Sequence, residues 1–148
     1  MRKIVIQDKF KSPPYSLHDA HLLNLIPDKN AICLHFQYGY LQTTAPYGQV
    51  NGDVEITGLD WDFCCAYVME YTQVRCGNCG SFIGRKMTIQ DFLKGYANAT
   101  VDVMDEVYGY NQVKISGFLN HGRKCDEVQL EFYYTGEFRY LIENETKV

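Results

Sequence analysis

The chain has 148 residues, which fits one domain large enough to bury roughly two-thirds of the surface that its unfolded form exposes. Its net charge of −4, without any long run of Lys or Arg, argues against nucleic-acid binding through a basic surface. No apolar stretch approaches the ~20 residues of a membrane span, and the apolar run at residues 4–6 is too short for a signal peptide. We therefore predict a cytoplasmic protein whose six cysteines are thiols or metal ligands, because disulfides are rare in reducing compartments.

Alternating apolar and polar residues predict short β-strands along most of the chain, and the twelve Tyr and eight Phe also favour strands. The first predicted strand covers residues 3–6. Strands at residues 22–26 and 31–41 are predicted to form a hairpin around residues 27–30, where Pro, Asp and Asn are typical of turns.

Residues 53–71 are predicted to hold the central strands, which meet near Gly58. From residue 59 to residue 69, every second residue belongs to one mostly apolar set. This set consists of Leu59, Trp61, Phe63, Cys65, Tyr67 and Met69. A period of two predicts one long strand with this set against the core, and the only Trp places that strand in the middle of a sheet.

A single short helix is predicted near residues 88–96, where Thr88 can cap the first turn and Asp91 lies within it. Strands at residues 99–108 and 112–119 follow, and strands at residues 127–134 and 137–142 are predicted to close the chain as a hairpin. About eight short strands and one helix predict a mainly β fold, an antiparallel sandwich or open barrel. The absence of a linker or repeat in the sequence predicts a single domain over residues 1–148.

The pair Cys76 and Cys79 is a local signal for metal binding. Two thiolates two residues apart on a tight, glycine-containing turn are typical of half a zinc site. Structural zinc needs two more ligands, and His121 with Cys125 is the best complement in the sequence. The alternative interpretation is a Gly-rich hairpin turn whose thiols bind nothing, and the protein then has no cofactor.

The motif His18-Asp19-x-His21 is a second candidate site. A His beside a carboxylate can act as a general base or as a metal ligand. The alternative is a structural corner formed by His18 and Asp19. Asp60 and Asp62 share one side of the predicted strand, where they could extend such a site or belong to a solvated face.

Several tyrosines lie on or beside the predicted turns and are candidates for a binding surface. They are Tyr38, Tyr40, Tyr108, Tyr110 and Tyr133. Tyr combines a large apolar ring with a polar tip, which suits protein interfaces and sugar stacking. Ordinary packing within strands is the alternative, since Tyr is a good strand residue.

The segment Ser16-Leu17-His18-Asp19-Ala20-His21-Leu22, followed by the predicted hairpin, resembles the start of several small bacterial β-rich domains of unknown function. Some of those domains are associated with polymorphic-toxin immunity proteins. The resemblance covers about a quarter of the chain. It implies a small cytoplasmic binding protein rather than an enzyme, with His18 and Asp19 as structural corner residues.

The sequence thus favours a non-enzymatic domain that binds another protein. The partner is expected to be a basic protein, which the acidic chain would attract, or a second copy held through an edge strand such as one in the C-terminal hairpin. Two alternatives stay open. One is a zinc-stabilised module, and the other is an enzyme or carbohydrate-binding domain that uses His18, Asp19, Asp60 and Asp62 around a tyrosine-lined cleft.

Overall fold

The computed structural model describes the backbone of residues 2–76 and 79–144 and the side chains of residues 2–72 and 80–144. The described residues form thirteen strands in two antiparallel sheets. In sheet order, the ten strands of the large sheet are β1 (Arg2–Ile6), β13 (Phe138–Glu143), β7 (Gly52–Ile56), β4 (Ala31–Gln37), β3 (His21–Asp28), β10 (Thr100–Tyr108), β11 (Gln112–His121), β12 (Lys124–Tyr133), β8 (Cys65–Cys76) and β9 (Cys79–Met87). The small sheet contains β2 (Tyr15–Ser16), β5 (Tyr40–Gln42) and β6 (Gln49–Val50).

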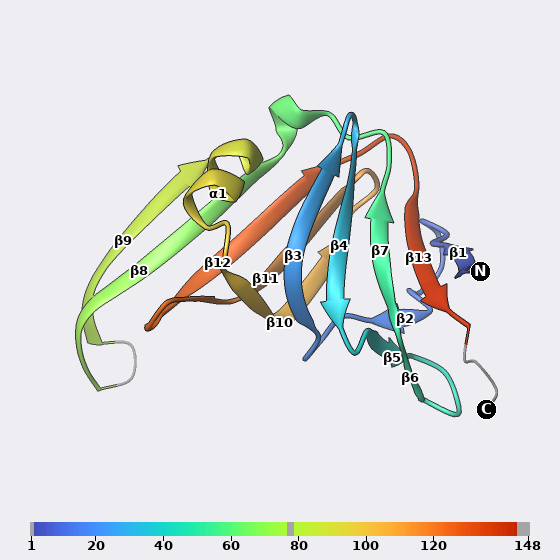
Figure 1. Ribbon diagram of the computed structural model, residues 1–148, viewed down its shortest axis with the longest axis horizontal. Helices are drawn as coiled ribbons and strands as arrows, with labels where there is room; N and C mark the ends of the chain where they lie inside the picture. The colour runs from blue at the N-terminus through green and yellow to red at the C-terminus, as the bar shows by residue number, and fades with distance from the viewer. Residues whose placement is uncertain (1, 77–78, 145–148) are drawn as a thin grey trace.

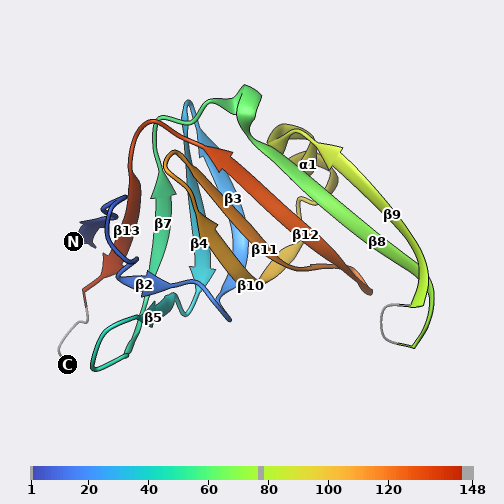
Figure 2. The same ribbon diagram turned by 180° about the vertical axis from the view of Figure 1, so that it is seen from behind.

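The large sheet folds over on itself to make two layers. Strands β3 and β10 pair only at His21–Asp102 and Leu22–Val101, and beyond these pairs they diverge. Figures 1 and 2 show β13, β7, β4 and β3 on one side and β10, β11, β12, β8 and β9 on the other. Tyr108 on β10 packs against Phe138 on β13 with ring centroids 5.5 Å apart, although three strands separate them in sheet order. The predicted mainly β, antiparallel fold with one short helix is confirmed, with more strands among the described residues than expected.

The core lies between the two layers. Along β11 and β12 every second residue is buried, as expected for a sheet with one face on the core and the other in solvent. Leu34 and Val54 from the first layer and Ile115 and Leu130 from the second are 0% exposed. The predicted hairpin of β3 and β4 is confirmed, with Lys29 and Asn30 between the strands.

Helix α1 (Ile89–Gly95) begins where the sequence predicts it. The hydroxyl of Thr88 accepts the backbone N–H of Asp91 at 3.0 Å, which caps the first turn. Ile89 and Phe92 are its buried residues. The helix lies over β8 and β12 beside β3, so it covers a part of the second layer that the first layer does not reach (Figure 1). Within residues 2–76 and 79–144, no helix has the length and apolar character needed to cross a membrane.

The prediction of one long strand from residue 59 is wrong. Residues Trp61–Phe63 form the 3-10 helix η1, whose first turn is capped when Asp60 accepts the N–H of Asp62. Strand β8 begins after this turn and buries Ala66 and Val68, which belong to the opposite set of residues. Phe63 is 65% exposed. The cap at Asp60 interrupts the alternation and changes which face is buried.

The predicted C-terminal hairpin is also wrong. β12 pairs with β11 and β8 in the second layer, whereas β13 pairs with β1 and β7 in the first. Residues 134–137 therefore cross from one layer to the other. β13 is an inner strand, and the two ends of the sheet order are β1 and β9.

Candidate functional site

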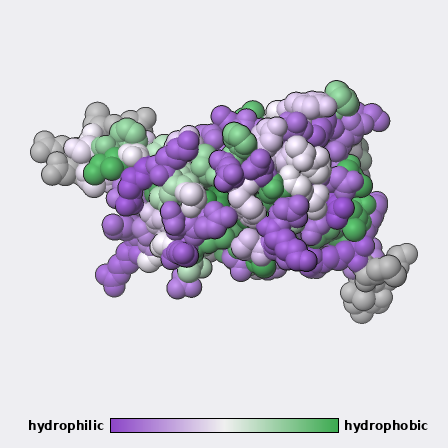
Figure 3. All heavy atoms as spheres, turned by 90° about the horizontal axis from the view of Figure 1, so that it is seen from above, coloured by the Kyte–Doolittle hydropathy of each residue, from purple (hydrophilic) through white to green (hydrophobic). Residues whose placement is uncertain are grey.

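Strands β8 and β9 extend past the rest of the second layer as a two-stranded ribbon. β12 pairs with β8 only from Cys65 to Met69, so within the described chain β8 continues from Glu70 with β9 as its sheet neighbour. We call residues 70–76 and 79–83 the arm. Figures 1 and 2 show it projecting from the body, and Figure 3 shows apolar surface on it. Two-stranded ribbons are marginally stable in water, so this arm is a place where a further strand would add stability.

β9 presents a long free edge on this arm. It lies at the end of the sheet order, and residues 80–86 are all exposed. Phe82 and Ile83 point to opposite faces of the ribbon, because neighbouring strand residues do, and they are 58% and 56% exposed. The outer row of backbone N–H and C=O groups of such a strand is a template for pairing with another strand.

The outer face of the ribbon carries aromatic side chains and Met69 together with Lys86, and it is hollowed. Opposed pairs on it are Tyr67–Lys86, Met69–Gly84 and Tyr71–Phe82. The Tyr71 and Phe82 ring centroids are 5.7 Å apart, and the Lys86 ammonium lies 5.7 Å from the Tyr67 ring centroid. A hollow of about 510 Å³ lies here, with Gly84 in its lining. A Cβ on Gly84 would meet the Phe82 ring at 3.5 Å, an ordinary van der Waals contact.

The opposite face of the ribbon is polar at its base and apolar further out. Val68 opposes Arg85, and Glu70 opposes Ile83. Arg85 forms an ion pair with Glu70 and donates a hydrogen bond to the hydroxyl of Tyr96 at 3.1 Å. Arg85 therefore ties the base of the arm to the end of α1, and Ile83 lies just beyond that anchor.

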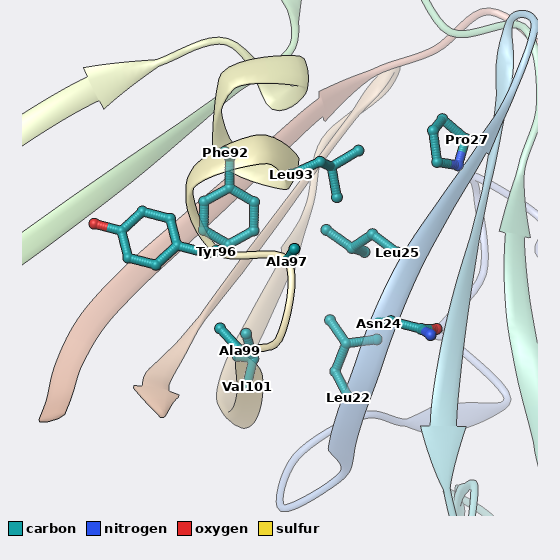
Figure 4. A pocket seen from close by; sticks show the side chains of 10 residues that line it. All are labelled: Leu22, Asn24, Leu25, Pro27, Phe92, Leu93, Tyr96, Ala97, Ala99 and Val101. Carbon is teal, nitrogen blue, oxygen red and sulfur yellow. The ribbon is translucent and has the colours of Figure 1, made fainter. Parts of the chain in front are cut away.

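An apolar pocket of about 360 Å³ lies between α1, β3 and β10 (Figure 4). It exists because β3 and β10 diverge after their two paired residues. Its lining consists of Leu22, Asn24, Leu25, Pro27, Phe92, Leu93, Tyr96, Ala97, Ala99 and Val101. The Tyr96 hydroxyl points away from the space in Figure 4, toward the side where Arg85 reaches it. This lining has no carboxylate or imidazole, so the pocket suits an apolar group rather than acid–base chemistry.

The structure does not gather the candidate tyrosines on one surface. Tyr40 is 2% exposed and donates its hydroxyl to the carbonyl of Asp53, so its assignment to a binding surface is wrong. The hydroxyl of Tyr108 is buried, which also removes that residue from a surface. Tyr38 and Tyr110 are each 68% exposed, but Tyr38 lies beside His18 whereas Tyr110 packs near Phe10. Tyr133 is half-buried next to Phe63, and its backbone pairs with Gln112, two residues after Tyr110.

His18 and Asp19 form a tight turn against β10. The N–H of Ala20 bonds to the carbonyl of Leu17, and Asp19 has a φ of 64°. The backbone N–H of Asp19 donates to Val103, and the His18 ring bonds to the carbonyl of Met104. That carbonyl, followed by the charge of Asp19, raises the pKa of His18. The corner interpretation of the motif stays a prediction.

Asp60 and Asp62 do not converge with this corner. Asp60 and Asp62 flank Trp61, whose indole N–H donates to the carbonyl of Lys29 after the end of β3. The corner precedes the other end of β3, eight residues away, or roughly 26 Å along a strand. The carboxylates and the histidine therefore belong to separate parts of the surface, and the four-residue catalytic cleft does not form.

The zinc hypothesis stays a prediction. The side chains of Cys76 and Cys79 lie outside the described residues, although their backbones pair across the β8–β9 turn. Cys125 is exposed, and His121 Nε2 lies 2.6 Å from the buried carboxylate of Asp126. Zinc on that nitrogen would have to displace this carboxylate. Among the described side chains, no three His, Cys, Asp or Glu residues are grouped to hold a metal ion.

Comparison with protein-family models, with curated proteins and with solved structures found no match to this chain. The arm is therefore the feature on which a functional interpretation depends. The sequence patterns did not predict it. Its signal was the alternation of Tyr67, Met69 and Tyr71 opposite Phe82 and Gly84. Exposure of that set depends on where the pairing of β12 with β8 stops, at Glu127 and Met69, which no local pattern contains.

Proposed function

We propose that this protein is a non-enzymatic binding domain whose β9 edge pairs with a β-strand of a protein partner. The observation that carries the proposal is an edge strand, β9, that is exposed from Gly80 to Lys86 and forms one side of a two-stranded ribbon at its outer end. Strand addition supplies main-chain hydrogen bonds along the edge, and the side chains of Phe82 and Ile83 gain neighbours on both faces. Aromatic residues and Met, as found on the outer face of the ribbon, are enriched in the centres of protein interfaces.

The proposed setting is the bacterial cytoplasm. Cys33, Cys64, Cys65 and Cys125 are free thiols, and burial raises the pKa of Cys33, Cys64 and Cys65, which keeps these groups protonated and unreactive. Thiols of this kind are compatible with a reducing compartment.

Affinity capture tests the proposal. A tagged form of the protein is expressed beside an untagged copy in cells of the source organism, and the proteins that bind the tagged form are recovered. The variant Phe82→Asp/Ile83→Asp places two charges on the edge, a device that discourages strand pairing. Phe10→Asp/Phe63→Asp is the matched control, since these aromatic side chains are 85% and 65% exposed elsewhere on the surface. We expect the unmodified protein and the control to retain the same partner and the edge variant to lose it. Equal capture by all three would contradict the proposal.

A second candidate function is binding of a small apolar ligand in the pocket beneath α1. The observation that favours it is the open apolar volume next to side chains such as Leu25 and Phe92, which are 9% and 4% exposed. Benzene, as a probe, should raise the melting temperature of the unmodified protein by binding the folded state. Ala97→Leu fills the pocket mouth and should abolish the shift. Equal shifts for the two proteins would exclude this pocket.

A further inference from the structure

We propose that the partner strand at β9 is β9 of a second copy of this chain, running antiparallel around a two-fold axis at Gly84. This inference rests on the proposed function, because it names the occupant of the same edge. A two-fold interface uses one surface twice, so the edge must be complementary to itself. In this register, each residue of β9 must therefore suit the β9 residue that it faces.

The outer face meets this requirement at two equivalent positions. With Gly84 opposite Gly84, Phe82 of each copy faces Lys86 of the other. Lys86 already lies 5.7 Å from the ring centroid of Tyr67 in its own chain. The second copy places a further aromatic face, that of Phe82, on the other side of the ammonium group. A cation between two aromatic rings is a favourable arrangement.

The helix-side face is complementary in the same register. Ile83 of each copy faces Arg85 of the other. The Arg85 side chain is held by Glu70 and by the Tyr96 hydroxyl of α1. The exposed Ile83 of the second copy therefore packs beside the aliphatic part of an arginine that is already fixed in place.

The charges on β9 do not oppose self-pairing in this register. Between Gly80 and Met87 the strand has two cations, Arg85 and Lys86, and no acidic residue. In the antiparallel register each cation faces an apolar residue, so like charges are not opposed. The register pairs residues 81–83 of each copy with residues 85–87 of the other, so the two-stranded part of each ribbon gains a third strand.

Charge exchange at position 82 tests the pairing and its register. Phe82→Lys places a lysine opposite Lys86 at both equivalent positions, and Phe82→Lys/Lys86→Glu converts these contacts into opposite-charge pairs. Sedimentation equilibrium over a dilution series measures the dimer dissociation constant, and circular dichroism checks that each variant is folded. We expect a dimer for the unmodified protein, about tenfold weaker dimerisation for Phe82→Lys, which is about 1.4 kcal/mol, and recovery in the double variant.

Two results would overturn the inference. One is a monomer throughout the dilution series, and the other is a dimer that Phe82→Lys leaves intact or that the double variant fails to restore. The capture experiment separates these failures from failure of the proposed function. Suppose that the purified chain is monomeric and that, in the capture experiment, Phe82→Asp/Ile83→Asp loses a protein other than the untagged copy. β9 then pairs with that protein and not with itself.

Discussion

The Tyr108 hydroxyl is buried beside the hydroxyl of Tyr140, without a well-aligned hydrogen bond among the described residues. Burial raises the pKa of Tyr108, because the phenolate would lose its hydration. Its ring packs edge-on against Phe138 and contributes to the core, whereas burial of the hydroxyl carries a desolvation penalty.

Tyr108→Phe should therefore raise the free energy of unfolding by about 1 kcal/mol, because it removes a buried polar group without creating a cavity. Tyr40→Phe is the matched control. It removes the hydrogen bond from Tyr40 to the Asp53 carbonyl at 2.8 Å and should lower stability by about 1 kcal/mol. Urea unfolding of the two variants measures both effects. A loss of stability in Tyr108→Phe would mean that the hydroxyl has a partner in solution.

Glu106 links stability to pH near the corner at His18. Its carboxylate accepts the N–H of Leu17 at 2.9 Å, but burial is the larger influence and raises the pKa of Glu106. A pKa that is higher in the folded chain means that the folded chain binds the proton more tightly. The contribution is then fully present below the unfolded pKa of about 4.3 and is lost as the pH rises through the folded pKa.

Glu106→Gln keeps an oxygen acceptor for Leu17 and removes the charge. We expect the variant to be more stable than the unmodified protein at neutral pH, and the difference to shrink as the pH falls and Glu106 becomes protonated. Urea unfolding at a series of pH values gives this comparison. A difference that does not change with pH would show that burial of the charged form is not what limits stability at this position.

At the scale of elements, local patterns predicted those structures whose cause is local. The helix follows from Thr88 and Asp91 together with the apolar face of Phe92, and the β3–β4 hairpin follows from its turn residues. The alternation after Leu59 predicted the wrong face, because the Asp60 cap inserts a turn of 3-10 helix. Periodicity identifies a strand and its faces, but it contains no information about its neighbour.

That limit explains both the misplaced hairpin and the missed arm. β12 and β13 alternate as paired strands would, yet they belong to different layers. Tyr40 and Tyr110 are both tyrosines beside turns, but Tyr40 packs against Tyr15 and Tyr140 in the core whereas Tyr110 is exposed. These differences are set by contacts distant in sequence, so the candidate site required the structure.

The cap of α1 is the element for which sequence and structure agree most directly. Thr88→Ala removes the acceptor for the N–H of Asp91 and should lower the free energy of unfolding by about 1 kcal/mol. Thr88→Ser retains the acceptor and should stay close to the unmodified protein. Thermal unfolding of the pair isolates the hydroxyl. Equal loss in both variants would instead assign the effect to packing of the Thr methyl group.

At the scale of the whole molecule, the two layers are joined by two connections that cross side by side. Residues 57–64 lead from β7 to β8, and residues 134–137 lead from β12 to β13. The N–H of Thr135 bonds to the carbonyl of Gly58, and the N–H of Thr57 bonds to that of Glu137, each at 2.9 Å. The two connections come closest at a glycine in each, Gly58 in the first and Gly136 in the second.

Gly136→Ala tests whether this crossing holds the layers together. A Cβ on Gly136 would lie 2.4 Å from the carbonyl oxygen of Thr57, closer than real Cβ atoms approach backbone, so the two connections would have to separate. We expect the free energy of unfolding to fall by about 1–3 kcal/mol, as in other overpacked sites.

Gly95→Ala is the control, because a Cβ there meets nothing within 4 Å and should stabilise the helix by about 0.5–1 kcal/mol. If Gly136→Ala unfolds like the unmodified protein, the two connections can separate without cost, and the core and the β3–β10 pairing hold the layers together. A loss confined to Gly136→Ala would show that the close backbone contact, rather than replacement of a glycine as such, fixes how the two layers meet.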